Sequence, residues 1–301
     1  MAKSESKKPD DRSGAQLELQ PGQSVELLKA LHILTRDGRM NQDSRRKLKQ
    51  VNHLVKLIEP ALDALVSTEP NFTVVDHGAG KSYLGFLLVD SYLKDKAPGA
   101  RVIGIERRAE LNEKAQTLAR KAGFSQMQFL AMDARDAITS QALPAKVDMV
   151  TALHACDTAT DDAIAFALRR EAQYVVVVPC CQAEVAAQLR QRKKPYDPDP
   201  MSELWRRPLH TREFGSHLTN TLRCLQLEAH GYRVTVTELV GWEHAMKNEL
   251  IIAQRKGKPQ ASAAQKLQAI LERIGLPALS ERFFVPTALN PLNPLNPSGN
   301  T

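Results

Sequence analysis

Short apolar runs alternate with amphipathic stretches through the middle of the chain. Five runs rich in valine, isoleucine and leucine predict buried strands: Phe72–Val75, Arg101–Glu106, Gln126–Ala131, Lys146–Leu153 and Gln173–Val178. The stretches between them carry apolar residues at helical spacing, which predicts helices at Tyr83–Leu93, Ala109–Ala122 and Asp161–Arg170. Strands that alternate with helices predict an α/β fold built on a parallel sheet.

Two further strands follow these units. Helices are expected at Gln182–Arg192 and Thr211–Ala229, and the proline-rich segment Pro195–Pro208 is predicted to be a loop between them. Gly231–Val240 and Glu249–Ala253 then read as a terminal pair of strands joined by a loop. The whole pattern predicts a Rossmann-like sheet of seven strands, with one antiparallel strand at its edge.

The segments outside the sheet differ in character. Residues 1–20 are polar and charged and are expected to be disordered. Residues 21–70 are predicted to form a helical segment that precedes the sheet domain of residues 71–255. Residues 256–301 are predicted to contain a basic linker, a short helix and a disordered tail with an asparagine–proline–leucine repeat.

The amino-terminal segment holds two expected helices, Val25–Leu34 and Arg45–Leu65. Asp43 or Ser44 is expected to cap the second helix. Four basic residues follow at its start: Arg45, Arg46, Lys47 and Lys49. This basic run is either a contact for the substrate or an ordinary solvated face.

The charge of the chain is basic and unevenly distributed. The formal net charge is +7, yet residues 71–180 contain 13 basic and 13 acidic residues, so the excess lies in the flanking segments. A neutral core with basic flanks favours a polyanionic partner such as RNA. Ordinary surface lysines and arginines are the simpler alternative.

Composition also bears on the compartment. No stretch approaches the ~20 apolar residues of a membrane span, and the first residues lack the apolar core of a signal peptide. The four cysteines have no regular spacing, so they do not predict a disulfide framework. We therefore expect a reduced, cytoplasmic protein with no membrane partner.

A glycine-rich turn follows the first expected strand. Asp76 ends the strand, Gly78 and Gly80 let the backbone turn tightly and approach a ligand, and Lys81 comes next. Ser82 is expected to cap the following helix. The sequence Gly-Lys-Ser resembles the end of a phosphate-binding loop, but that motif needs an earlier glycine where a valine stands here. Asp-x-Gly-x-Gly instead resembles the S-adenosylmethionine (SAM) methyltransferases of the Rossmann-like class, in which the acid can meet the ammonium of SAM. A plain turn is the simpler alternative.

Acidic residues also follow the next two strands. Glu106 ends the second strand, where dinucleotide- and SAM-binding folds have an acid that accepts hydrogen bonds from both ribose hydroxyls. Asp133 follows the third strand, where SAM enzymes have an acid or amide that meets the adenine amino group. Capping of a helix is an alternative role for Asp133, and the two roles can coexist. The predicted cofactor-binding residues are therefore Asp76, Gly78, Gly80, Lys81, Glu106 and Asp133.

The fourth and fifth strands end in polar and thiol side chains. His154, Cys156 and Asp157 follow the fourth strand, and Cys180 and Cys181 follow the fifth. The carboxyl ends of parallel strands meet at one edge, where open α/β sheets bind their ligands. All the candidate residues of the chain are thus expected on one rim.

Three motifs on this rim resemble one particular SAM methyltransferase family. They are Val75–Leu84, Leu153–Asp157 and Val178–Gln182, within a resemblance that spans residues 45–255. The family includes methyltransferase-like protein 25 and the methyltransferase half of a glutathione-transferase C-terminal-domain protein. These relatives are similar in a Gly-x-Gly-Lys-Ser/Gly-x-Leu loop, a Leu-His-x-Cys segment and a Cys-Cys pair. The chain departs from the eukaryotic members at Asp157, where they have glycine, and at Gln182, where many have tyrosine.

The resemblance implies a SAM-dependent methyltransferase that acts on RNA or on a ribosome-associated protein. A small-molecule methyltransferase and a non-catalytic protein that binds SAM or RNA are the alternatives. Salt-sensitive RNA binding would distinguish the first reading from the second.

Methyl transfer needs a well-positioned nucleophile and, for some targets, a base. His154 is the candidate base, because an unperturbed imidazole titrates near pH ~6.5, and a structural role is its alternative. Cys156, Cys180 and Cys181 are placed as in RNA cytosine-C5 methyltransferases, but the longer Asp-Ala-Pro-Cys-type motif of those enzymes is absent, which favours a non-covalent route. Adjacent cysteines do not easily chelate one ion, so no metal is expected. Together with Asp157, these four residues are the predicted catalytic set.

Overall fold

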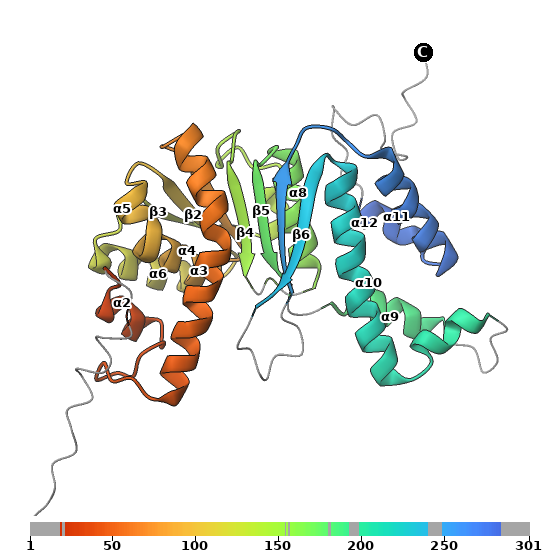
Figure 1. Ribbon diagram of the computed structural model, residues 1–301, viewed down its shortest axis with the longest axis horizontal. Helices are drawn as coiled ribbons and strands as arrows, with labels where there is room; N and C mark the ends of the chain where they lie inside the picture. The colour runs from red at the N-terminus through yellow and green to blue at the C-terminus, as the bar shows by residue number, and fades with distance from the viewer. Residues whose placement is uncertain are drawn as a thin grey trace, which may run out of the picture.

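The computed structural model describes residues 19, 22–153, 155, 157–179, 182–192, 199–239 and 249–283. The strands are β1 (Thr73–His77), β2 (Arg101–Glu106), β3 (Met127–Ala131), β4 (Met149–Leu153), β5 (Tyr174–Val178), β6 (Tyr232–Glu238) and β7 (Glu249–Arg255). They form one seven-stranded sheet in the order β3-β2-β1-β4-β5-β7-β6 (Figure 1). The predicted Rossmann-like sheet is therefore confirmed.

Helices fill the connections between the strands. Before the sheet come α2 (Val25–Ala30) and α3 (Gln42–Thr68). Within the α/β units lie α4 (Tyr83–Leu88), the π-helical turn η1 (Val89–Leu93), α5 (Lys94–Lys96), α6 (Ala109–Ala122), α7 (Ala134–Ala137) and α8 (Thr158–Arg169). After β5 come α9 (Glu184–Gln191), the 3₁₀ turn η2 (Pro200–Trp205), α10 (Pro208–Ala229), α11 (Ala261–Arg273), the 3₁₀ turn η3 (Pro277–Leu279) and α12 (Ser280–Phe283).

The antiparallel strand lies inside the sheet and not at its edge. The strands β1 to β5 pair in parallel, whereas β7 pairs antiparallel with both β5 and β6. The edge strand is β6, most of whose residues are exposed, whereas β7 is more apolar and more buried. The expectation of an antiparallel edge strand was wrong because the more apolar strand of the hairpin gains more from an interior position.

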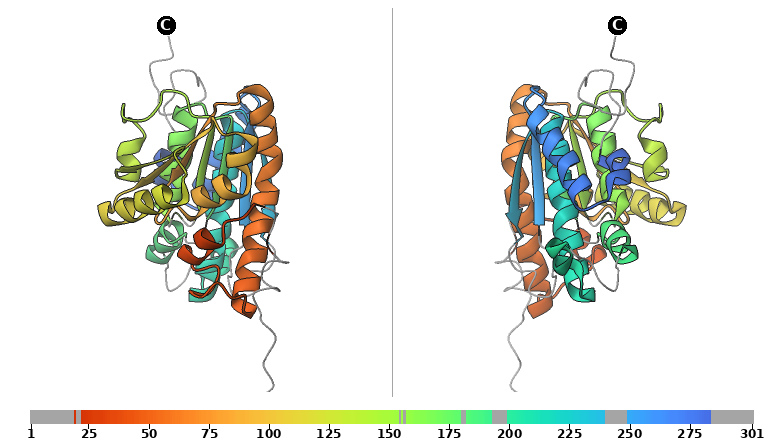
Figure 2. Two further views of the ribbon diagram at one scale, coloured as in Figure 1. Left: turned by 90° about the vertical axis from the view of Figure 1, so that its left-hand side faces the viewer. Right: turned by 90° about the vertical axis from the view of Figure 1, so that its right-hand side faces the viewer.

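Each face of the sheet has its own core. On β5, Val176 and Val178 pack into the core that contains α3 and α4, while Val175 and Val177 pack into the core that contains α8. This alternation follows from the two-residue period of a strand. Figure 2, which views the molecule from either end of the sheet, shows α3 on one side and α8 on the other. Within the described residues, no helix is long and apolar enough to cross a membrane.

A third apolar core lies beyond the end of the sheet. It joins side chains of α9, η2, α10, α11 and α12, and Trp205, Leu222, Leu271 and Phe283 are among its buried members. The segment Pro195–Pro208 was expected to be a loop, yet η2 occupies Pro200–Trp205 and Pro208 already starts α10. The carboxyl-terminal segment also holds more structure than one short helix, since the chain packs into this core as far as Phe283.

The amino-terminal helices form one wall of the molecule. The first predicted helix ends early, at Ala30, whereas α3 is longer than predicted and contains Pro60 in its interior. Asn41 caps α3, because its side-chain oxygen accepts a hydrogen bond from the Ser44 backbone N–H at 2.8 Å. The prediction that Asp43 or Ser44 caps this helix was therefore wrong.

The carboxyl ends of the parallel strands lie at the lower edge of the sheet in Figure 1. The first turns of α3 extend below this edge on one side. The amino-terminal turns of α10, together with α9, extend below it on the other side. The predicted rim is thus flanked by two helical arms, one that precedes the parallel strands in the sequence and one that follows them.

Candidate functional site

The glycine loop turns out of β1 and bends back toward β2. Gly78 and Gly80 have φ angles of 68° and 58°, in the left-handed region that favours glycine. The Ala79 N–H donates to the Ile105 carbonyl at 2.8 Å, and the Gly80 N–H donates to the Glu106 carboxylate at 2.9 Å. The loop is therefore fixed to the end of β2, and a backbone without side chains faces the space above the rim.

Ser82 does not cap α4. Its backbone is left-handed (φ 52°), and its hydroxyl makes no capping hydrogen bond. The hydroxyl instead donates to the Asp76 carboxylate at 3.2 Å, and Thr151 on β4 donates to the other carboxylate oxygen at 3.0 Å. A Cβ atom on Gly85 would lie 2.6 Å from this hydroxyl, so glycine is needed there to make room for it. The serine was predicted to be a cap from its residue type alone, but its left-handed backbone and its hydrogen bond to the buried Asp76 turn the hydroxyl away from the capping position.

Asp76 is the buried acid of the site. It lies within β1, not after it, and only 2% of its surface is exposed. Burial raises the pKa of its carboxyl to about 6, against the opposing effect of hydrogen bonds from Thr151, Ser82 and the Gly85 backbone. The adjacent His77 points to the other core, where it contacts the Phe166 ring, and burial lowers its pKa to about 4. His77 is thus a neutral core residue.

Glu106 has both of its oxygens occupied by protein donors. One oxygen accepts from the backbone N–H and Nε of Arg108 at 3.0 and 2.8 Å. The other accepts from the Gly80 N–H, with an Arg108 Nη2 at 3.3 Å. Burial alone would raise the pKa of Glu106, but these hydrogen bonds and the charge of Arg108 outweigh it, and the pKa lies below its ordinary value. Glu106 is therefore an ionised acceptor that is covered by an exposed arginine.

A pocket of about 530 Å³ opens beside the glycine loop. Asp76, Gly78, Gly80, Lys81 and Arg108 are among the residues that line it. The remaining wall comes from the amino-terminal segment and from apolar residues next to the loop: Leu31, His32, Lys47, Gln50, Val51, Leu54, Tyr83, Leu84 and Leu153. The volume is within the usual range for a small-molecule site.

Asp133 caps α7, because its carboxylate accepts from the Arg135 N–H at 3.0 Å. This is the alternative role that the sequence left open for it, and its predicted contact with adenine remains a prediction. In the described part of the chain, no group of three or more histidine, cysteine or acidic side chains could hold a metal ion.

Most of the predicted catalytic set lies outside the described residues. This applies to His154, Cys156, Cys180 and Cys181, whose roles remain predictions. The fifth member, Asp157, is described: its carboxylate accepts from the backbone N–H groups of Ala183 and Glu184 at 2.8 and 3.1 Å. Asp157 therefore ties the loop after β4 to the start of α9.

Sequence reasoning missed three parts of the site. Thr151 sits in the middle of an apolar strand, and its hydroxyl is one of the two side-chain donors to Asp76. Arg108 follows Glu106 by two residues, a spacing that gives no signal before the loop is folded. The sequence predicted α3 as a helix with a basic start that could contact the substrate, but it did not predict that α3 lines the pocket.

Comparison with known proteins identifies the class of enzyme to which this chain belongs. Residues 46–188 match the sequence profile of a family described as a methyltransferase domain. The chain is a SAM-dependent methyltransferase. SAM is accordingly its cofactor. The matched segment runs from the first turns of α3 to α9, and so includes every pocket residue except Leu31 and His32.

Several solved structures resemble this methyltransferase in fold. An rRNA methylase from Streptococcus thermophilus is 9% identical, with 66% of this chain and 95% of that chain covered and a TM-score of 0.42. Magnesium protoporphyrin IX methyltransferase from Synechocystis PCC 6803, solved with bound SAH, is 17% identical (82% and 100% covered, TM-score 0.41). A SAM-dependent methyltransferase from Aquifex aeolicus is 18% identical (81% and 98% covered, TM-score 0.37). No curated protein is significantly similar in sequence.

Proposed function

We propose that this methyltransferase transfers the methyl group of SAM to RNA. Asp76 and the glycine loop would hold the methionine part of SAM, and Glu106 would accept hydrogen bonds from the ribose. Three features support this arrangement: a buried carboxyl in the lining of the pocket, backbone without side chains at Gly78 and Gly80, and an ionised acid at the end of β2. The cofactor supplies the methyl group, and the chain supplies position and electrostatics.

The charge of the pocket carries the proposal of an RNA substrate. Lys47, Lys81 and Arg108 line the pocket together with His32, whereas Asp76 is the one acid among its lining residues. SAM itself has a net positive charge, because its sulfonium and ammonium outnumber its carboxylate. Cations around the pocket therefore do not favour SAM, but they do favour a second substrate with phosphate groups.

The first turns of α3 extend this basic surface. Lys47 pairs with Asp43 at 2.7 Å, and Lys49 is exposed without an ion pair among the described residues. The amino terminus of a long helix adds partial positive charge at the same place. The sequence left open whether the basic run contacts substrate, and the position of Lys47 in the pocket lining supports that reading.

Tritium-labelled SAM and an extract of a strain that lacks the gene would test the proposal. We expect the purified enzyme to label the RNA fraction. Label confined to the protein fraction would favour a ribosome-associated protein, and label in the small-molecule fraction would favour a metabolite. Either result would overturn the RNA proposal.

Salt dependence of RNA binding gives a second test. Lys49→Ala and Lys81→Ala should each weaken RNA binding and reduce the slope of log K against log salt by about one phosphate contact. Lys146→Ala is the matched control, because this lysine lies before β4, at the opposite edge of the sheet. Equal effects of all three substitutions would show that the rim is not the RNA site.

A further inference from the structure

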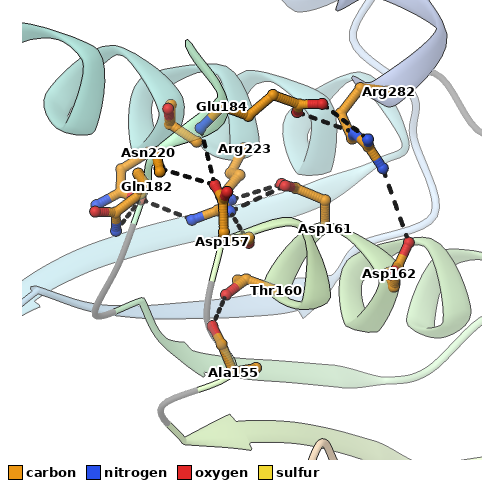
Figure 3. A network of polar contacts seen from close by, with 12 residues as sticks. Ala155, Asp157, Thr160, Asp161, Asp162, Gln182, Glu184, Asn220, Arg223 and Arg282 are labelled. Carbon is orange, nitrogen blue, oxygen red and sulfur yellow. Dashed lines mark hydrogen bonds and ion pairs between the residues drawn. The ribbon is translucent and has the colours of Figure 1, made fainter. Parts of the chain in front are cut away.

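A buried ion pair lies behind the loops that follow β4 and β5. Arg223, in the middle of α10, has no exposed surface, and Asp161, in the first turn of α8, is 3% exposed. The guanidinium donates to both carboxylate oxygens, at 2.6 and 3.0 Å. Figure 3 shows this pair at the centre of a network of polar side chains. Replacing such a pair with apolar residues often leaves stability unchanged or improved, so stability alone is a weak reason for it.

The same arginine holds a strained residue. Arg223 donates from Nη2 to the Asp157 carbonyl at 2.9 Å. Asp157 has φ 51° and ψ −120°, backbone angles that residues other than glycine rarely adopt. The Asp157 carboxylate also accepts two backbone N–H groups at the start of α9. Strain of this kind persists only where several contacts enforce it, and here these contacts come from α9 and α10.

The network continues to the loop after β5. Asn220, one turn before Arg223, accepts from the guanidinium at 3.1 Å and from the Gln182 amide at 3.3 Å. Ser216 donates to Gln182 at 2.7 Å, and Asn220 donates to Glu249 at the start of β7. One face of α10 thus holds both Asp157 and Gln182. These two residues lie next in sequence to Cys156 and Cys181 of the predicted catalytic set.

We propose that Arg223 is a positioning residue for methyl transfer, which fixes Asp157 after β4 and, through Asn220, Gln182 after β5 in the geometry that the target requires. This inference rests on the proposed methyl transfer and on the prediction that the catalytic residues follow β4 and β5. It does not depend on the identity of the substrate. A misplacement of about 1 Å in such a pocket can cost on the order of 10²-fold in rate.

The decisive variant replaces the whole pair, as Asp161→Leu with Arg223→Met, so that no buried charge is left alone. The control is Glu171→Gln with Arg255→Met. It removes a partly exposed ion pair of 2.6 Å at the edge of the sheet opposite the carboxyl ends of the parallel strands. Arg223→Lys is the second variant. It keeps the positive charge, but a lysine cannot make the bidentate contact with Asp161 and bind the Asp157 carbonyl at the same time. Thermal unfolding, SAM affinity by calorimetry and single-turnover labelling of extract RNA are measured for each.

We expect the double variant to unfold within a few degrees of the wild type and to bind SAM within about threefold of its affinity. Its single-turnover rate should fall about 10²-fold or more, and Arg223→Lys should lie between it and the wild type. The control pair should keep the full rate. A folded double variant, or a folded Arg223→Lys, with wild-type turnover would overturn the proposal and leave Arg223 a purely structural residue.

Hydrogen exchange separates this inference from the proposed function. If the wild type labels no RNA, the proposal of an RNA substrate is wrong. Amide hydrogen exchange in peptides spanning 153–160 and 179–184 then tests the positioning role of Arg223 by itself. Exchange about tenfold faster in the double variant, with the rest of the sheet unchanged, would support the positioning role. Unchanged protection of both peptides would overturn it.

Discussion

SAM binding by this enzyme should depend on pH through Asp76. Burial raises the pKa of this carboxyl to about 6 from an ordinary 3.8. If its ionised form meets the ammonium of SAM, the ionised fraction falls about tenfold between pH 7 and pH 5, and the dissociation constant of SAM should rise about tenfold. Near pH 6, binding should release about half a proton, because SAM draws the carboxyl into its ionised form.

Calorimetry in buffers of different ionisation enthalpy measures both quantities. The essential variant is Asp76→Asn, which keeps an acceptor for Ser82 or Thr151 but cannot ionise. It should bind SAM more weakly at pH 7 and show little pH dependence. His32→Gln is the control, because this imidazole lines the same pocket. A tenfold dependence that survives in Asp76→Asn, or disappears in His32→Gln, would refute the assignment.

The same raised pKa has a consequence for the free energy of unfolding without SAM. The folded state holds the Asp76 proton more tightly than the unfolded state, so stability should fall as the pH rises from about 4 to about 6. A shift from 3.8 to about 6 corresponds to about 3 kcal/mol. Asp76→Asn should therefore be more stable than the wild type at pH 7 by up to this amount, as measured by urea unfolding.

Three further substitutions test separate parts of the structure. Glu106→Ala should weaken SAM binding by about 1–3 kcal/mol, because the ribose loses its acceptor and the Gly80 N–H loses its partner. An unchanged dissociation constant in calorimetry would show that Glu106 does not bind the ribose. Arg108→Met should leave SAM binding equal or tighten it severalfold, because the guanidinium covers Glu106 and repels a cationic ligand. Loss of this ion pair should cost only about 0–1 kcal/mol of stability. Weaker binding would show that Arg108 itself contacts SAM. Gly215→Ala should lower stability by about 1–3 kcal/mol, because its Cβ would lie 2.8–2.9 Å from Ala186 on α9, and a wild-type urea midpoint would show that the two helices can separate freely.

The rim was predictable because it depends on local pattern. A buried parallel strand is marked by an apolar run, and Asp76 and Glu106 interrupt such runs at their carboxyl ends. The glycine spacing then fixes the loop, since Gly78 and Gly80 both need positive φ. The exact limits of the strand were not predictable, and β1 extends through Asp76 to His77 because both side chains are covered by later elements.

The support behind the rim was not predictable, because its partners are far apart in sequence. Arg223 shares one face of a long helix with the polar residues Asn220 and Gln226, so the sequence resembles that of a solvated face. Its partner Asp161 lies 62 residues earlier, on α8. The order of β6 and β7 left a signal that was not used: the stretch from Leu250 to Ala253 is wholly apolar, whereas residues 232–238 alternate.

The third core separates two kinds of change in this enzyme. Its helix α10 holds Asp157, after β4, through Arg223 at 2.9 Å, and α12 is joined to α9 by the pairing of Arg282 with Glu184 at 2.9 Å. Asp76 and Glu106 lie on strands that do not touch this core. Substitutions among α9 to α12 can therefore reshape the target side while the cofactor side is preserved, which gives evolution a route to new methyl acceptors that keeps the same methyl donor.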